Sequence, residues 1–230
     1  MLYTRQTAKE NIRNRDGKRV FYLGSHDQLT SDARDWLRQE RIEILPAAQA
    51  KPEKWALLGG GWCDAKPEHM THLDGQTLVP KTHPRIAFRG AMDTLEAELL
   101  LCCLETGEER LLQILEQVRL LLRCDVLGEP VPDTPLCGLS QEELRSRSHR
   151  PQDFYGQPHF MPSASDGRKI LLLNKARTAA RAAELCAVHA FSDRDGVPTR
   201  PDILRALNRM SSMLYLLMIE HKVKNNPIKE

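Results

Sequence analysis

The sequence predicts a mainly α-helical protein, in which a five-helix bundle follows a small N-terminal α/β appendage. Only 5% of its 230 residues are aromatic, and leucine, alanine, arginine and glutamate are abundant, which favours helices over a β-sandwich. Apolar residues repeat with helical spacing through the second half, whereas two short runs near the N-terminus are strand-like. The 41% hydrophobic content is sufficient for one sizeable core.

Two strands and a helix are predicted in the appendage. The run Arg19–Leu23 is strand-like, and Arg41–Leu45 alternates between apolar and polar residues as a half-buried strand does. Between them, Leu29–Glu40 contains a helix that is expected to start at Thr30 or Ser31. The appendage is therefore expected to be a β-α-β unit or a hairpin plus a helix.

A loop region is expected to follow the appendage. The stretch Pro46–Pro80 is rich in glycine, proline, histidine and lysine, and loops of that length are often functional or mobile. The predicted division of the chain is an appendage at 1–50, a loop region at 51–82 and a helical-bundle domain at 83–230.

Five helices are predicted after the loop region from the spacing of apolar residues. They cover residues 86–104, 108–127, 140–148 and 168–191, and a last segment that starts after Thr199 and Pro201 and runs to about His221. Ser140 followed by Glu143 has the pattern of a capping box that opens the third helix. The short connections favour a bundle.

Charge, hydropathy and cysteine content exclude several classes of protein. The formal charge is only +2, whereas a nucleic-acid-binding protein usually has a basic surplus. No apolar run is long enough for a membrane span, and the N-terminus lacks the apolar segment of a secretory signal. The six cysteines are expected to be reduced thiols. We therefore expect a soluble, intracellular protein.

Polar residues form stripes on three of the predicted helices. The first stripe, on the helix predicted at 168–191, consists of Asn174, Arg177, Arg181 and Glu184. The second, on the helix at 86–104, consists of Arg89, Asp93 and Glu96. The third, on the last helix, consists of Asn208, Ser212 and Tyr215. The ordinary interpretation of each stripe is a solvated helix face with weak ion pairs. The functional interpretation is a binding site formed where the three helices pack together.

The two arginines of the first stripe are suited to a polyphosphate. Arg177 and Arg181 are four residues apart on one face, so they present two planar forks, which a triphosphate fits. The phosphate-binding loop G-x-x-x-x-G-K-[ST] and the dinucleotide motif G-x-G-x-x-G are both absent from the sequence. A nucleotide would therefore bind in some other way.

Several segments match a known family in order. They are VPKTHPRIAFRGAMDTL at 79–95, HFMPSASDGRKILLLNKARTAARAAE at 159–184 and PDILRALNRMSSMLYLLM at 201–218, together with GLSQEELRSRSH at 138–149 and QLTSDARDWLRQERIEI at 28–44. In this order and spacing they resemble the corrinoid (ATP:cob(I)alamin) adenosyltransferases, most closely their ethanolamine-utilisation branch. The resemblance covers most of the chain.

The resemblance implies a five-helix bundle, usually a trimer, with each active site between neighbouring subunits. It also implies a role for each matching residue on the ATP side. Arg177 and Arg181 match the paired ATP-binding arginines, and Asp93 matches the aspartate that pairs with the first of them across the subunit boundary. The other ATP-binding positions are Lys81 on the phosphates, Glu184, Asn208, and Thr71 and His72, which stand where the family's glycine-rich loop lies.

On the corrin side, the resemblance implies that Phe160 or Met161 fills the lower face of the corrin. It implies transfer of the 5′-deoxyadenosyl group of ATP to cob(I)alamin, with Mg²⁺ present, triphosphate released and adenosylcobalamin formed. Such a reaction requires orientation of the ribose C5′ and stabilisation of the leaving triphosphate rather than acid–base catalysis. An apolar side chain below the cobalt would leave a four-coordinate, more easily reduced metal.

Two other functions stay open. The chain could be a non-catalytic carrier of corrinoid or ATP, or a helical bundle associated with a bacterial microcompartment through its appendage. The partners implied by the resemblance are other copies of the chain, a B12-dependent enzyme such as ethanolamine ammonia-lyase, and the microcompartment; no nucleic acid and no membrane are expected. The expected location is the cytoplasm, with the interior of such a compartment as the alternative.

No metal site is predicted in the protein itself. Cys63, His69 and His72 have a spacing that suits zinc, but a tetrahedral site needs a fourth ligand. Cys102 and Cys103 lie on an apolar helix and are expected to be core thiols.

Overall fold

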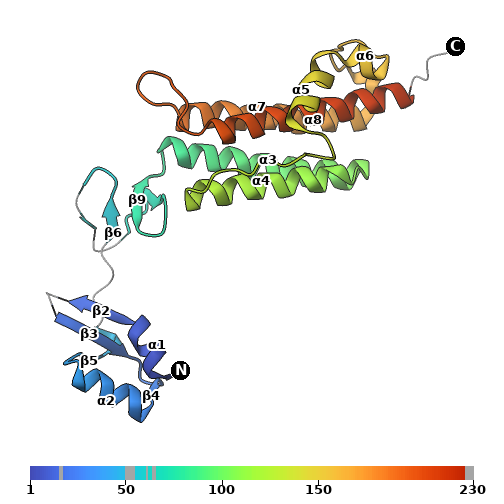
Figure 1. Ribbon diagram of the computed structural model, residues 1–230. Coiled ribbons are helices and arrows are strands. Elements are labelled where there is room, and N and C mark those ends of the chain that lie inside the picture. The colour runs from blue at the N-terminus through green and yellow to red at the C-terminus, as the bar shows by residue number, and fades with distance from the viewer. Residues whose placement is uncertain (16–17, 50–54, 61, 64–65, 226–230) are drawn as a thin grey trace. The chain divides into compact units, whose positions relative to one another are not determined.

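A computed structural model describes residues 1–15, 18–49, 55–60, 62–63 and 66–225 of the chain (Figure 1). These residues belong to two compact units, the first formed by Met1–Trp55 and Trp62–Ala65 and the second by Ala56–Gly61 and Lys66–Glu230. Among the described residues, no helix is both long and apolar enough to cross a lipid bilayer.

The first unit is a small α/β fold. Its elements are β1 (Leu2–Tyr3), α1 (Arg5–Glu10), β2 (Ile12–Arg15), β3 (Lys18–Leu23), β4 (Gln28–Leu29), α2 (Ser31–Gln39), β5 (Glu43–Pro46), the 3-10 turn η1 (Ala47–Gln49) and β7 (Trp62–Cys63). Strands β2 and β3 pair antiparallel, β3 and β5 pair parallel, and β1 pairs parallel with β4. The two predicted topologies are therefore both present, because a β2–β3 hairpin precedes the β3–α2–β5 crossover.

Helix α2 lies on one face of this sheet because its sequence is amphipathic. Thr30 caps the helix by accepting a hydrogen bond from the backbone N–H of Ala33, as the sequence predicts. Ala33 and Leu37 are fully buried, and they pack in one apolar cluster with Phe21 of β3. The ring of Tyr3 meets that of Phe21 edge to face with centroids 5.1 Å apart.

The expectation of a loop region at 51–82 is wrong where the structure describes this segment. It contains strands β6 (Trp55–Leu57), β8 (Met70–His72) and β9 (Thr77–Pro80). Strand β9 pairs parallel with β6 and antiparallel with β8. The turn between β8 and β9 is stabilised by Asp74, whose carboxylate accepts the backbone N–H groups of Gln76 and Thr77.

The helical part confirms the predicted mainly α fold. The helices are α3 (Pro84–Thr106), α4 (Arg110–Leu127), α5 (Gln141–His149), α6 (Pro151–Tyr155), α7 (Gly167–Ala190) and α8 (Pro201–Asn225), with a 3-10 turn η2 at Ala164–Asp166. Five of them match the predicted segments, and the short α6 was not predicted. The predicted capping box between Ser140 and Glu143 is present at the start of α5.

Helices α3, α7 and α8 form the centre of the bundle, with α4 against α3 and α5 against α8 (Figure 1). Helices α3 and α7 run antiparallel, because Arg168 at the start of α7 pairs with Glu105 near the end of α3, and the Phe191 ring just after α7 meets Phe88 near the start of α3. Helix α7 packs closely because its inner face carries small residues. These are Ala176, Ala180, Ala183 and Ala187, all fully buried.

Candidate active site

The first predicted stripe lies beside the buried face of α7. Each of three stripe residues directly follows one of the buried alanines in sequence: Arg177, Arg181 and Glu184. Because each residue advances a helix by about 100°, these three lie next to the inner face rather than opposite it. Arg177 is half-buried and Arg181 is exposed. The Nε of Arg177 donates a hydrogen bond of 3.1 Å to the Oδ1 of Asn174.

The two arginines carry uncompensated positive charge. Burial, and then the charge of Arg181 one turn away, lower the pKa of the Arg177 guanidinium from its ordinary value. Within the described residues, neither guanidinium forms an ion pair with a carboxylate. The half-buried and the exposed cation repel each other in this arrangement, and a bound polyanion would relieve that repulsion.

Helix α8 completes the polar face through Asn208. Its Nδ2 donates to the Oε1 of Glu184 over 3.0 Å, and its Oδ1 accepts from the Nη1 of Arg209 over 2.9 Å. Burial lowers the pKa of Arg209, with the charges of Arg145 and Arg205 adding to the effect. The structure therefore joins the first and third stripes through the Glu184–Asn208 contact.

Tyr215 of α8 connects Arg177 to the loop before α7. The guanidinium carbon of Arg177 lies 5.8 Å from the centre of the Tyr215 ring. The Tyr215 hydroxyl accepts the backbone N–H of Phe160 over 3.3 Å and lies 3.0 Å from Nδ1 of His159. The His159 ring stacks on the Tyr215 ring with centroids 5.8 Å apart.

The same loop is held at a second point by an ion pair. Lys222 of α8 pairs with Asp166, whose carboxylate also accepts the backbone N–H of Ser163 over 2.7 Å. Phe160 lies half-buried, with its ring 6.1 Å from that of Tyr215, and the Nζ of Lys222 is 5.4 Å from its centre. Met161, its neighbour, is 88% exposed. The two corrin candidates therefore differ in their surroundings, because the Phe160 ring packs against α8 whereas the Met161 side chain is exposed.

A buried carboxylate positions the β8–β9 hairpin that carries Thr71 and His72. Asp125 of α4 is fully buried and binds both Arg85 and Arg89 of α3, with the Nε of Arg89 2.7 Å from its Oδ2. The Nη2 of Arg89 donates in turn to the backbone oxygen of Leu73 over 2.8 Å. One arginine thus connects the hairpin to two helices. Lys81, at the end of the hairpin, is exposed and pairs with Glu68 over 3.3 Å.

Comparison with known proteins identifies the family. The model of the family described as cobalamin adenosyltransferase matches residues 62–221, well over half of the chain. The chain belongs to this family. The matched region contains the β8–β9 hairpin, the loop at His159–Asp166 and the four residues of the paired-arginine face, Arg177, Arg181, Glu184 and Asn208.

Individual relatives are similar over much of the chain. The corrinoid adenosyltransferase EutT of Escherichia coli (strain K12) is 39% identical over 157 residues, which cover 67% of this chain and 59% of the relative. That of Salmonella typhimurium is 38% identical over 216 residues, 93% of this chain and 80% of the relative. The corrinoid adenosyltransferase PduO of Citrobacter freundii is 29% identical over 150 residues, or 60% and 43%. The family and branch predicted from the ordered segments are confirmed, although the match to the E. coli relative spans about three fifths of that protein.

The second predicted stripe is not a single surface. Arg89 points to Asp125, and Glu96 pairs with Arg119 of α4 over 2.9 Å, so both hold helices of the bundle together. Asp93 is exposed and has no hydrogen bond or ion pair with a described side chain of its own chain. The ordinary interpretation, a solvated helix face with weak ion pairs, fits Glu96, whose partner Arg119 is about half exposed. It does not fit Arg89, which is largely buried and pairs with the fully buried Asp125, while Asp93 stays available.

Three residues of this region were not predicted as site residues. Tyr215 and Arg209 lie on the same helix as Asn208, and of these two only Tyr215 belongs to a predicted stripe. Asp125 gave no signal, because a single aspartate in an apolar helix resembles any other surface residue until its partners are known. The described residues contain no group of three or more histidine, cysteine, aspartate or glutamate side chains that could hold a metal.

Proposed function

We propose that the chain transfers the 5′-deoxyadenosyl group of ATP to cob(I)alamin and releases triphosphate. The observation that carries this proposal is the pair Arg177 and Arg181, two adjacent guanidinium groups without a carboxylate partner among the described residues, in a chain of the cobalamin adenosyltransferase family. In the reaction, the Co(I) electron pair forms the Co–C5′ bond. The C5′–O bond breaks, its electrons leave with the triphosphate, and cobalt becomes formally Co(III).

The residues of the paired-arginine face divide the work of binding ATP. Arg177 and Arg181 neutralise the charge that develops on the leaving triphosphate, which is electrostatic stabilisation of the transition state. Asn208 is held by Glu184 and Arg209 at both ends of its amide, so it presents a fixed polar group to the nucleotide. Lys81 adds a third cation, and Thr71 and His72 approach the phosphates from the hairpin. Mg²⁺ binds together with ATP, mainly through phosphate oxygens, as is usual for this ion.

The complete site is proposed to form between subunits of a trimer. Asp93 is exposed on α3, and the antiparallel register of α3 and α7 places it near the level of the turn from Arg181 to Glu184. Leu185, one residue past that turn, is 71% exposed, and large exposed apolar side chains often mark interfaces. An Asp93 from a neighbouring subunit would then pair with Arg177. The mass of the chain in solution, measured by sedimentation, tests the trimer.

The product, adenosylcobalamin, is proposed to supply a B12-dependent enzyme such as ethanolamine ammonia-lyase, in the cytoplasm or inside a microcompartment. The support is the similarity to relatives named EutT. A pull-down of the ammonia-lyase with the full chain tests this association.

The decisive experiment is an anaerobic assay with ATP, Mg²⁺ and chemically reduced cobalamin, in which formation of the Co–C bond is followed optically. We expect product in the wild type and a loss of about ten- to a hundredfold in kcat/KM for Arg177→Ala, the effect of removing a charged hydrogen-bond donor of roughly 1.5–3 kcal/mol. Arg168→Ala is the matched control, because Arg168 lies on the same helix but is exposed and pairs with Glu105. Binding of both substrates without product would favour the carrier instead.

The role of the loop is tested by two variants, Phe160→Ala and Met161→Ala. The side chain that covers the lower corrin face should matter far more for turnover from cob(II)alamin than from pre-reduced cob(I)alamin, because it excludes the axial ligand that makes reduction difficult. We expect one variant to lose the four-coordinate EPR signal of cob(II)alamin bound with ATP, while its ATP affinity stays nearly unchanged. If both variants keep the signal at wild-type intensity, the assignment of this loop to the corrin is wrong.

A further inference from the structure

A cavity in the first unit lies outside the region that the family match explains. It has a volume of about 400 Å³ and is lined by Leu23, Leu29, Arg34, Arg38, Ile42 and Ile44. The family match begins at residue 62, so none of these six residues belongs to the matched region. The volume falls within the range typical of ligand-binding pockets.

The cavity forms where helix α2 does not fully cover its sheet. Ile44 of β5 pairs in register with Phe21, and Leu23 lies two residues further along β3, so Leu23 and Ile44 are on the sheet face that α2 covers. Phe21 is fully buried beneath the helix, whereas Ile44 is 39% exposed and Leu23 half-buried. The side chains of Leu23 and Ile44 thus remain accessible between α2 and the sheet, at the end that the helix does not cover.

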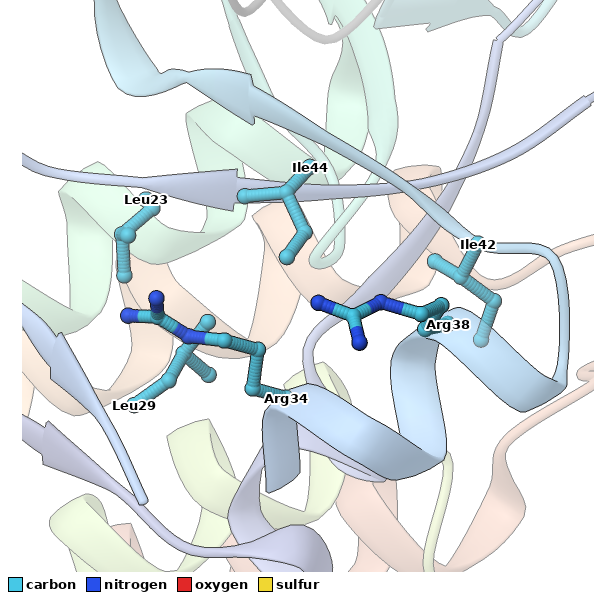
Figure 2. Close-up of a pocket in the computed structure, with 6 residues that line it drawn as sticks. All are labelled: Leu23, Leu29, Arg34, Arg38, Ile42 and Ile44. Carbon is cyan, nitrogen blue, oxygen red and sulfur yellow. The ribbon is translucent and has the colours of Figure 1, made fainter. Parts of the chain in front are cut away.

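Two arginines of α2 border this apolar floor. Arg34 and Arg38 are four residues apart, and Figure 2 shows both guanidinium groups directed toward the space between the helix and the side chains of Leu23 and Ile44. Among the described residues, the only ion-pair partner of Arg38 is Asp35, at the long distance of 3.9 Å and with both side chains exposed. Such pairs contribute little. Within the described part of the chain, the guanidinium of Arg34 has no hydrogen-bond or ion-pair partner.

The strand beside the cavity is also open for pairing. Strand β5 is an outer strand of the β2–β3–β5 sheet as far as the structure describes it, so one row of its backbone N–H and C=O groups lacks a neighbouring strand. A peptide that pairs with β5 would place every second side chain on the Ile44 face, toward the cavity and its arginines. The cavity thus offers three elements together: backbone pairing, an aliphatic floor and two cationic forks.

We propose that this cavity, independently of the transferase site, docks an extended segment of a partner protein in which every second residue is in turn acidic and aliphatic, so that both kinds face the cavity. Charge complementarity selects the acidic residues, because each guanidinium can bind a carboxylate in a bidentate manner. The aliphatic residues cover Leu23 and Ile44, and pairing with β5 sets the register. The unit thus serves to recruit a partner to the chain.

The test uses the full chain and a fluorescein-labelled peptide in which leucine, glutamate, leucine and aspartate occupy every second position with serine between them, and binding is followed by fluorescence anisotropy. The neutral control peptide carries asparagine and glutamine in place of the acids. We expect saturable binding of the acidic peptide, weaker at high salt, and at least tenfold weaker binding of the neutral peptide. A photoreactive leucine in the acidic peptide is expected to crosslink within residues 23–46.

Matched variants locate the site. Arg34→Gln and Arg38→Gln should each weaken peptide binding by about tenfold, and Ile44→Ser should weaken it without changing its salt dependence. Lys18→Gln, which removes one charge from the same unit at an exposed position, should leave binding unchanged. Transferase activity should be the same in all four variants, so failure of this proposal is distinguishable from failure of the proposed function.

Four results would overturn the proposal: no saturable binding, equal binding of the neutral peptide, binding that survives both arginine substitutions, or crosslinks outside residues 23–46. Binding of the chain to phosphatidylglycerol vesicles but not to the acidic peptide would also overturn it, because the arginines would then serve a lipid surface.

Discussion

Replacing Asp125 with alanine should destabilise the second unit more than most single substitutions. The side chain is fully buried and binds two arginines of α3, and the Nη2 of Arg85 also donates to its backbone oxygen over 2.7 Å. Removal of the carboxylate leaves Arg85 and Arg89 partly buried with no acid to compensate their charge. An unpaired buried charge is costly because it has lost water without gaining a partner.

The magnitude follows from this arrangement. Breaking a buried ion pair by removing one partner costs about 3–5 kcal/mol, and here one carboxylate serves two cations. For a chain of this size each kcal/mol lowers Tm by about 2–4 °C, so Asp125→Ala should lower Tm by roughly 6–20 °C. Thermal unfolding followed by circular dichroism measures it. Asp133→Ala, an exposed aspartate in the segment after α4, is the control and should stay within about 0.5 kcal/mol of wild type.

The Asp125→Ala substitution should also destabilise the β8–β9 hairpin. Arg89 donates to the backbone oxygens of His72 and Leu73, and its orientation depends on Asp125. Hydrogen exchange in the hairpin should therefore accelerate in Asp125→Ala and not in Asp133→Ala. A Tm change below about 1 °C, or hairpin exchange identical to wild type, would refute the view that this carboxylate connects α3, α4 and the hairpin.

Two further predictions concern pH and the loop. Burial alone would raise the pKa of Asp202, but the hydrogen bonds from Arg200 and neighbouring backbone N–H groups outweigh it and lower that pKa to about 2, so its contribution to stability is present above about pH 4 and is lost as pH falls through 2. Asp202→Asn should flatten this part of the curve of unfolding free energy against pH, and an unchanged slope would contradict the assignment. Tyr215→Phe keeps the ring beside the arginine but removes the hydroxyl that holds His159, so KM for the corrinoid should rise while KM for ATP changes little; a larger change for ATP would show that the hydroxyl does not act through the loop.

The helices were predictable because their signals are local. Apolar spacing through 86–104 and 168–191, and the Ser140–Glu143 capping box, depend on residues within one or two turns of each other. The strands β6, β8 and β9 were missed because each has only three or four residues within a stretch rich in turn-forming residues. Their pairing depends on contacts between segments, which no short window of sequence contains.

Site residues divide in the same way. The position of Arg177 and Arg181 on one helix face could be predicted because it depends only on their spacing, whereas their role in binding ATP stays a proposal. Arg89 was assigned to a surface stripe because its partner, Asp125, is 36 residues away on another helix. Side-chain partners across helices are set by packing, which the sequence pattern of a single helix does not contain.

Tyr215 contacts both Arg177, the proposed ligand of the triphosphate, and the loop proposed to cover the corrin. Its ring lies against the guanidinium of Arg177, and its hydroxyl holds the backbone of Phe160. A triphosphate that draws Arg177 away from the ring would change the surroundings of Tyr215, and the loop that Tyr215 anchors packs against that ring. If Phe160 covers the corrin as proposed, ATP binding and closure of the lower corrin face share this contact. Binding of ATP, whose C5′ the cobalt must attack, would then favour the four-coordinate cobalt.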